Sequence, residues 1–170
     1  MNQPFCIELR LLSHPEYLCV ARAAISTAVS KIGFSEAEAG KIEIALDEAL
    51  TNIIRHGYDG DNTKPIWLRF KHTASKPRPA FQLIIDDSAK QVDPSVIKGR
   101  DLDDVKPGGL GVNIIHAVMD SVDYAPRPEG GMRLTLNKTA ADPDAPDSDS
   151  ASAAPPDSAG QTNHNQGPTT

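Results

Sequence analysis

The sequence predicts an α+β fold, because its apolar residues follow two different periods in separate stretches. Residues 14–32 and 35–55 place apolar side chains three and four positions apart, which is typical of an amphipathic helix. Residues 5–12 instead alternate apolar and polar side chains, as a half-buried strand does. The remaining predicted elements are strands at 65–72, 81–87, 121–124 and 132–138 and a helix at 111–119.

The first long helix has a predicted start and stop. Ser13 is its expected N-cap, with Glu16 three residues later as the partner of a capping box, and Gly33 follows it as a stop signal. The apolar side chains at helical spacing are Leu18, Ala21, Ile25, Ala28, Val29 and Ile32.

The second long helix opens with a second capping box, in which Ser35 precedes Glu38 by three residues. We expect this helix to run to about Arg55 and Gly57 to end it. Its apolar stripe consists of Ile42, Ala45, Leu46, Ala49 and Ile53.

Length and charge predict one domain followed by an acidic tail. The chain has 170 residues and a formal net charge of −6. From residue 139 to the end there are five Asp, no Lys or Arg, and no large apolar side chain. A segment of that composition cannot bury enough apolar surface to offset the entropy of ordering it. We therefore predict a folded domain at 1–138 and a disordered tail at 139–170.

The composition also excludes several classes of protein. Since five of the 23 acidic side chains lie in the tail, residues 1–138 are nearly neutral, which is unlike a nucleic-acid-binding surface. No apolar run approaches the roughly 18 residues that a membrane span needs, and the N-terminus has no secretory signal pattern. Cys6 and Cys19 are too few for a disulfide framework, so we expect reduced thiols and a cytoplasmic location.

Polar residues on the second helix form the first candidate site. Glu48 and Asn52 are four residues apart and therefore share one helix face, beside the apolar stripe. A carboxylate can act as a base, and an Asn carbonyl can bind magnesium, which often takes only one or two protein ligands. Taken alone, such a pair is also common on a solvated helix face.

Asp87, at the end of a predicted strand, is the second candidate. Leu83 and Ile85 precede it at period two, so Asp87 falls on their face, which we predict to be buried, and Asp86 faces outward. A buried carboxylate needs a hydrogen-bond donor. A strand-end turn residue is the alternative interpretation.

A glycine-rich run precedes the third helix. Glycines at Gly108, Gly109 and Gly111 would let backbone amides approach an anion at the helix start, although an ordinary turn has the same composition. The run matches neither the dinucleotide-binding nor the P-loop motif. The long connection before it, 92–108, is typical of a functional lid. Its basic residues Lys98, Arg100 and Lys106 could each reach a phosphate, and the sequence does not choose among them.

In this order and spacing, these features resemble the GHKL (Bergerat) ATP-binding fold. The segment Ile44 to Asn52 with Arg55-His56-Gly57-Tyr58, and the segment Gly108 to Ile115 with Met119 to Tyr124, are similar to two signatures of the anti-sigma-factor serine/threonine protein kinases. The resemblance covers residues 5–138. It implies a two-layer α/β sandwich whose mixed, mostly antiparallel sheet is covered on one face by helices.

The resemblance also implies roles for individual residues. Asn52 matches the magnesium-binding Asn, Glu48 the base toward the incoming hydroxyl, and Asp87 the acceptor of the adenine amino group. The nucleotide, ATP, is further expected to contact Arg55, Gly109, Leu110 and Gly111. The implied cofactors are ATP and Mg²⁺. The implied partners are a STAS-domain anti-anti-sigma protein that carries the accepting Ser or Thr, a sigma factor, and a second copy of the chain in a homodimer.

The chain departs from the family pattern at two positions. Ala89 stands where a Gly often follows the adenine Asp, and Met132 stands where a Thr often contacts adenine through that Asp. Two other functions fit the same fold. One is a nucleotide-gated module that captures a sigma factor or activates another regulator without transferring phosphate. The other is a sensor histidine kinase, which needs a phospho-accepting His on a separate helical segment; none of the five His lies in such a segment.

Overall fold

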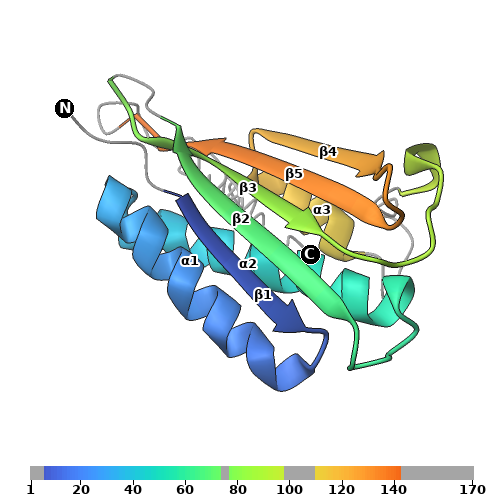
Figure 1. The fold of residues 1–170 in the computed structure, drawn as a ribbon. Helices are drawn as coiled ribbons and strands as arrows, with labels where there is room; N and C mark the ends of the chain where they lie inside the picture. Colours follow the sequence, from blue (N-terminus) through green and yellow to red (C-terminus); the bar gives the residue numbers. More distant parts are fainter. Residues whose placement is uncertain (1–5, 74–76, 98–109, 143–170) are drawn as a thin grey trace, which may run out of the picture.

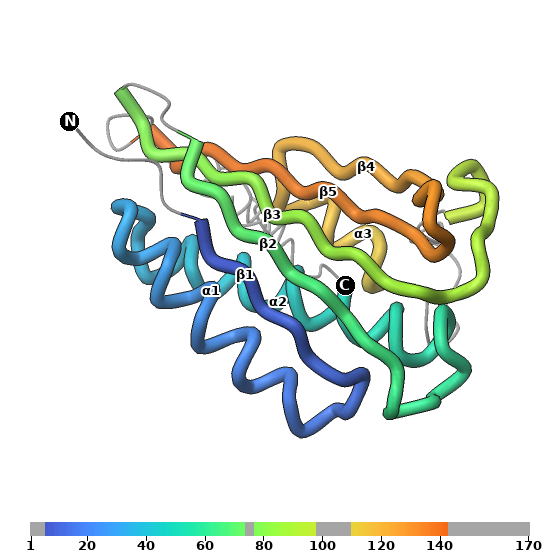
Figure 2. The backbone as a smooth tube through the Cα atoms, in the orientation of Figure 1, coloured from blue at the N-terminus to red at the C-terminus, as the bar shows by residue number. Residues whose placement is uncertain are grey.

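The computed structural model describes residues 6–73, 77–97 and 110–142, and in this part of the chain five strands form one antiparallel sheet. The sheet order is β1-β2-β3-β5-β4, and all four pairings between neighbours are antiparallel. Figures 1 and 2 show the strands crossing the molecule side by side, with β1 and β4 at the two edges. The strands are β1 (Cys6–Leu12), β2 (Pro65–Thr73), β3 (Ala80–Asp86), β4 (Ser121–Pro126) and β5 (Met132–Thr139).

The helices cover one face of this sheet and leave the other face open (Figure 1). The predicted α+β fold with two layers is thereby confirmed, and the sheet is antiparallel throughout the described part. The helices are α1 (Leu18–Ile32), α2 (Glu36–Asn52) and α3 (Leu110–Val118), with short helical turns η1 (Pro15–Tyr17), η2 (Ile53–Gly57) and η3 (Pro94–Val96). None of the helices in the described ranges is long and apolar enough to cross a membrane.

The core lies between the helix layer and the sheet. Alternation along β2 and β3 directs Phe70 and Phe81 inward, where their rings stack with centroids 5.1 Å apart. Phe34, which follows α1, packs against Phe81 at 5.5 Å. The largest fully buried side chains are Phe70, Phe81, Ile25, Ile42, Leu46, Leu50, Ile66, Leu68, Leu83, Ile85, Ile115 and Leu136. The predicted apolar stripes of the two long helices supply Ile25, Ile42 and Leu46 to this set.

The capping box of α2 is confirmed, and that of α1 was wrong. Ser35 Oγ accepts from the Glu38 amide while the Glu38 carboxylate accepts from the Ser35 amide. At the first helix, His14 caps η1 instead, and Ser13 is fully buried. Its hydroxyl donates to the Asp61 carbonyl and accepts from the Lys64 amide. Ser13 therefore joins the end of β1 to the loop before β2.

The last strand extends slightly beyond its predicted end. β5 includes Thr139, whose amide donates to the Asp120 carboxylate. Ala140 is buried, and its amide donates to the Pro79 carbonyl at 2.8 Å. The Ala141 amide then donates to the Glu38 carboxylate at 2.6 Å. The rest of the predicted tail, and most of the predicted lid, lie outside the described residues.

Candidate functional site

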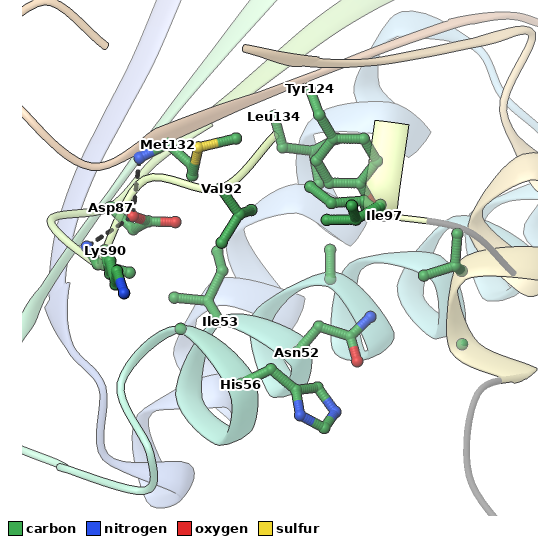
Figure 3. A pocket seen from close by; sticks show the side chains of 16 residues that line it. Asn52, Ile53, His56, Asp87, Lys90, Val92, Ile97, Tyr124, Met132 and Leu134 are labelled. Carbon is green, nitrogen blue, oxygen red and sulfur yellow. Dashed lines mark hydrogen bonds between the residues drawn. The ribbon is translucent and has the colours of Figure 1, made fainter. Parts of the chain in front are cut away.

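A pocket of about 360 Å³ lies between the helix layer and the end of the sheet that holds Asp87. Figure 3 shows Asn52 and His56 on one side of it and Asp87 with Met132 on the other. Its walls come from α2, η2, the segment after β3, the start of α3, and β4 and β5. The lining residues are Ala49, Asn52, Ile53, His56, Gly57, Asp87, Ala89, Lys90, Val92, Val96, Ile97, Gly111, Val112, Tyr124, Met132 and Leu134.

Helix α2 brings its polar pair to this pocket because the pair borders the buried stripe. Ala45, Ala49 and Leu46 pack into the core, so the adjoining face with Glu48 and Asn52 is half-buried at the edge of the helix layer. Asn52 lines the pocket directly. The helix then continues as the wider turn η2, in which the Tyr58 amide donates to the Ile53 carbonyl at 2.9 Å. Turns of this kind are frequent at functional sites.

Gly111 lies against the polar pair of α2. A Cβ atom at this position would collide with Glu48 Oε2 and would lie 3.2 Å from Glu48 Cδ and 3.5 Å from Asn52 Nδ2. A side chain at this position would therefore push the Glu48 carboxylate away from the first turn of α3. The structure thus brings together Glu48, Asn52 and the beginning of a helix, where backbone amides favour an anion.

Asp87 points into the opposite side of the pocket and is 5% exposed. Its Oδ1 atom accepts hydrogen bonds from the Ala89 amide at 2.8 Å and the Met132 amide at 2.9 Å (Figure 3). The Met132 bond comes from the main chain, so the Met side chain is compatible with it. Because both bonds go to Oδ1, the Oδ2 atom keeps its capacity to accept from a ligand.

Tyr58 ties the end of α2 to the segment that carries Asp87. Its hydroxyl donates to the Pro65 carbonyl at 2.5 Å and accepts from the Ser88 amide at 2.7 Å. Burial raises the pKa of Tyr58, so the hydroxyl stays protonated and can keep donating. Tyr58 is the last residue of the predicted motif Arg55-His56-Gly57-Tyr58. Its contacts with Ser88 join two segments that are 30 residues apart in the sequence.

The walls between these two ends are apolar. Ile53, Val92, Ile97, Tyr124 and Leu134 surround the space between Asn52 and Asp87 (Figure 3). Burial raises the pKa of Tyr124, consistent with a ring set among these side chains. An apolar space with one carboxylate at its end suits a heterocyclic base that presents a hydrogen-bond donor.

The Ala at position 89 fits because its neighbour is a glycine. A Cβ atom built at Gly57 would lie 3.1 Å from the Ala89 Cβ atom. The absence of a side chain at Gly57 therefore makes room for the methyl group. This packing accommodates the departure from Gly at position 89, on the wall of the pocket that both residues line.

The structure brings together most of the predicted site residues but not all. Asn52, Asp87 and Gly111 line the pocket, and Glu48 lies against Gly111. Arg55 is exposed and Leu110 is 53% exposed, and neither lines the pocket. The other predicted phosphate contacts, at Lys98, Arg100, Lys106, Gly108 and Gly109, lie outside the described residues.

His56, Lys90 and Tyr124 are polar lining residues for which no site role was predicted. His56 is four residues after Asn52, so its spacing from that residue could have indicated it. Lys90 follows β3 and Tyr124 is on β4, and both of these strands pair with β5. The pairing of strands that are distant in the sequence brings the two residues to the pocket, and no local spacing indicates it.

The donor set fits a magnesium ion that is shared with a phosphate ligand. Within the described ranges, no three His, Cys, Asp or Glu side chains gather as a metal-binding group. Magnesium needs no such group when phosphates and water complete its shell. The half-buried Asn52 amide, beside the space that a Cβ at Gly111 would fill, offers one oxygen ligand.

Comparison with known proteins identifies relatives along most of the chain. The histidine kinase-like ATPase domain matches residues 11–138. The serine-protein kinase RsbW of Halalkalibacterium halodurans is 26% identical over 146 residues, which cover 81% of this chain and 85% of the relative. The serine-protein kinase RsbW of Bacillus licheniformis is 30% identical over 140 residues, which cover 78% of this chain and 84% of the relative.

A solved structure shares the fold. It holds the RsbU and RsbW domains of a Mycobacterium tuberculosis protein and matches with a TM-score of 0.53 at 16% sequence identity. The match covers 81% of this chain and 32% of the solved chain. The match therefore spans about a third of that solved chain.

Proposed function

Because the chain belongs to the histidine kinase-like ATPase family and, within it, to the anti-sigma-factor serine/threonine protein kinases, we propose that it transfers the γ-phosphoryl group of ATP to a partner protein. The accepting residue is a Ser or Thr of a STAS-domain anti-anti-sigma protein, and the chain also binds a sigma factor. The observation that carries this proposal is that Asn52, Asp87 and Gly111 line one and the same pocket, with Glu48 against Gly111.

The Asp87 end of the pocket recognises the adenine base. Backbone amides of Ala89 and Met132 both donate to Oδ1, so Oδ2 accepts from the exocyclic amino group of adenine. A guanine base presents a carbonyl oxygen at that position, and two acceptors facing each other inside an apolar pocket leave both without a donor. The proposed site therefore selects ATP over GTP.

The α2 end of the pocket holds the phosphates. Backbone amides at the start of α3 donate to phosphate oxygens, and Gly111 permits their approach to the polar pair. The Asn52 side-chain oxygen would hold a magnesium ion. When bound, that ion supplies positive charge that offsets the charge of the phosphates.

Glu48 acts as the base in the proposed transfer. The hydroxyl oxygen of the partner's Ser or Thr forms a bond to the γ-phosphorus, while the bond from that phosphorus to the β–γ bridging oxygen breaks and ADP leaves. The hydroxyl proton passes to the Glu48 carboxylate. Its place beside Gly111 supports this role, because the phosphates are held at the same helix start.

The Glu48→Gln variant tests this assignment. The amide keeps the size of the carboxylate but cannot take the proton, so ATP affinity is unchanged and phosphorylation of the STAS partner falls by about 10²–10⁴-fold. Glu43→Gln, on the same helix but away from the pocket lining, is the matched control and keeps full activity. Normal transfer by Glu48→Gln would refute the role of Glu48 as base.

We also propose that the chain forms a homodimer through its β1 edge. Among the described residues, strand β1 pairs with β2 alone, so its outer edge can pair with another strand. Three large apolar side chains near this edge are exposed: Leu12 at 44%, Tyr17 at 43% and Val20 at 48%. Together with the unpaired outer edge of β1, these side chains offer an apolar surface that a second copy could cover.

A further inference from the structure

Arg127, in the turn between β4 and β5, holds the main chain of Asp87. Its Nη1 atom donates to the Asp87 carbonyl at 2.6 Å, and its side chain is only 17% exposed. The guanidinium lies over the Trp67 ring, 5.4 Å from the centroid. Because Trp67 alternates along β2 with the buried Ile66 and Leu68, its ring lies on the face of the sheet that the helices leave open. Its Nε atom is buried and lies 3.8 Å from Asp86 Oδ2. The side chain is thus fixed by its surroundings at the point where it meets Asp87.

The same turn is joined a second time to the segment that follows Asp87. Gln91 Nε2 donates to the Arg127 carbonyl at 2.5 Å and to the Gly131 carbonyl at 3.3 Å. Gly131 has a φ of +83°, and a Cβ atom there would collide with the Asp87 carbonyl oxygen. The main chains of the turn and of the segment 87–91 therefore lie in close contact. Arg127 donates from the turn to the segment, and Gln91 donates from the segment to the turn.

These contacts fix the direction of the Asp87 carboxylate. The Asp87 amide donates to the Met132 carbonyl at 3.0 Å, and the Met132 amide donates back to Oδ1. Arg127 holds the remaining main-chain group of Asp87, its carbonyl. All of the main-chain polar groups of Asp87 are thereby held by the β4–β5 turn and the start of β5.

We propose that Arg127, assisted by Gln91, is a positioning residue for base selection: by holding the Asp87 backbone from the open face of the sheet, it aims the Asp87 carboxylate at the amino group of adenine. The inference rests on the proposed function, in which Asp87 accepts that hydrogen bond. It assigns a role in the nucleotide pocket to a side chain that lies on the other face of the sheet.

A matched control lies on the same tryptophan. Arg10, on β1, also places its guanidinium over the Trp67 ring, 6.0 Å from the centroid. Strand β2 separates β1 from β3 in the sheet, so Arg10 shares the ring contact but lies away from the Asp87 segment. Comparing the two arginines separates the effect on Asp87 from a general effect on the sheet.

The experiment measures dissociation constants for ATP and for inosine triphosphate, whose base has a carbonyl in place of the amino group. Arg127→Met weakens ATP binding about tenfold, as expected when the Asp87 carboxylate no longer accepts the hydrogen bond from the adenine amino group. Binding of inosine triphosphate, which has no such amino group, changes much less. The preference for ATP therefore falls. Arg10→Met keeps the preference of the wild type, and Arg127→Lys, which retains a donor, restores part of it.

Three outcomes would overturn the inference: Arg127→Met with the wild-type preference, equal weakening of both nucleotides, or the same change in Arg10→Met. If Arg127→Met does not fold, Gln91→Met decides, because it removes the second contact of the turn while keeping a similar side-chain size. Failure of the wild type to bind either nucleotide would instead contradict the proposed function, so the two failures are distinguishable.

Discussion

At the scale of single residues, the approach of Gly111 to Glu48 leaves no room for a side chain. The atom that a Cβ would meet first is Glu48 Oε2, the end of a flexible side chain, so an added methyl displaces the carboxylate rather than the backbone. The position of the proposed base and the identity of residue 111 are therefore coupled. This coupling can be measured separately from stability.

We expect Gly111→Ala to reduce phosphoryl transfer strongly without lowering stability, since Ala favours a helix over Gly by roughly 0.5–1 kcal/mol. In the Glu48→Ala background the same substitution causes no further loss of transfer, because the carboxylate it displaces is already gone. Steady-state rates for both variants measure this coupling.

Gly40→Ala is the control for helix propensity. Gly40 is on α2 and a Cβ there meets nothing within 4 Å, so this change stabilises the protein and leaves the rate of transfer unaltered. Independent, additive losses from Gly111→Ala and Glu48→Ala would show that the two positions do not interact.

The residues of the candidate site differ in how far the sequence could predict them. The inward direction of Asp87 follows from Leu83 and Ile85 at period two, a local pattern that the structure bears out with 5% exposure. Asp86 lies on the outer face, as that pattern indicates, but is only 6% exposed because Arg133 pairs with both of its oxygens at 2.7 Å. Arg127 could not be predicted, because its contact with Asp87 spans 40 residues of chain.

At the scale of elements, the start of α2 is also an attachment point for the end of β5. The Glu38 carboxylate accepts from Ser35 and from the Ala141 amide, 103 residues later. Burial alone would raise the pKa of Glu38, but these hydrogen bonds from Ala141 and Ser35 outweigh it, so the pKa is lowered. One carboxylate thus caps a helix and holds the chain that leaves the sheet.

This lowered pKa predicts an acid-dependent stability. A carboxyl whose pKa is lower in the folded state stabilises the fold above its unfolded pKa, near 4.5, and loses that contribution as the pH falls through the folded pKa. The melting temperature of wild type therefore exceeds that of Glu38→Gln at pH 7. The difference shrinks toward zero below pH 4.5.

Glu36→Gln, in the same first turn of α2, is the matched control, since no hydrogen bond to its side chain joins it to the end of β5 in the described structure. The test compares the melting temperatures of wild type, Glu38→Gln and Glu36→Gln between neutral and acidic pH. A wild-type advantage over Glu38→Gln that persists unchanged in acid would contradict the assignment.

Local signals predicted the elements well, and contacts between distant segments caused the error at Ser13. The Ser35 box and the stop at Gly33, which has a φ of +108°, involve residues within one turn of the helix end. Ser13 has the right composition for a cap, but its partners Asp61 and Lys64 lie about 50 residues away in the loop before β2. No local pattern reports such a partner.

At the scale of the whole molecule, the sheet order assembles the Asp87 end of the pocket. Strand β5 pairs with β3 rather than lying at an edge, so Met132 reaches Asp87 and the β4–β5 turn reaches the segment that follows. The family resemblance implied a mostly antiparallel sheet covered on one face by helices, but no strand order was predicted from it. Hydrophobic periodicity gave the strands but contains no information on which strands become neighbours.

The end of the folded domain can be located by truncation. A chain ending at residue 142 keeps the melting temperature and ATP affinity of the full chain, because it retains the contacts of Thr139, Ala140 and Ala141. A chain ending at residue 138 loses three hydrogen bonds and is destabilised by about 2–4 kcal/mol. Chemical denaturation of the three lengths measures both effects. Equal stability of the two truncated chains would show that these contacts contribute nothing.

The central claim is that this pocket delivers the γ-phosphoryl group of ATP to a hydroxyl of a partner. The most direct measurement incubates the unmodified chain and a STAS-domain protein of the same organism with ATP labelled in either the α- or the γ-phosphate. We predict that label from the γ-phosphate, and none from the α-phosphate, appears on a Ser or Thr of the STAS protein. Tight ATP binding with no γ-label on the partner would contradict the claim and indicate a nucleotide-gated binding module instead.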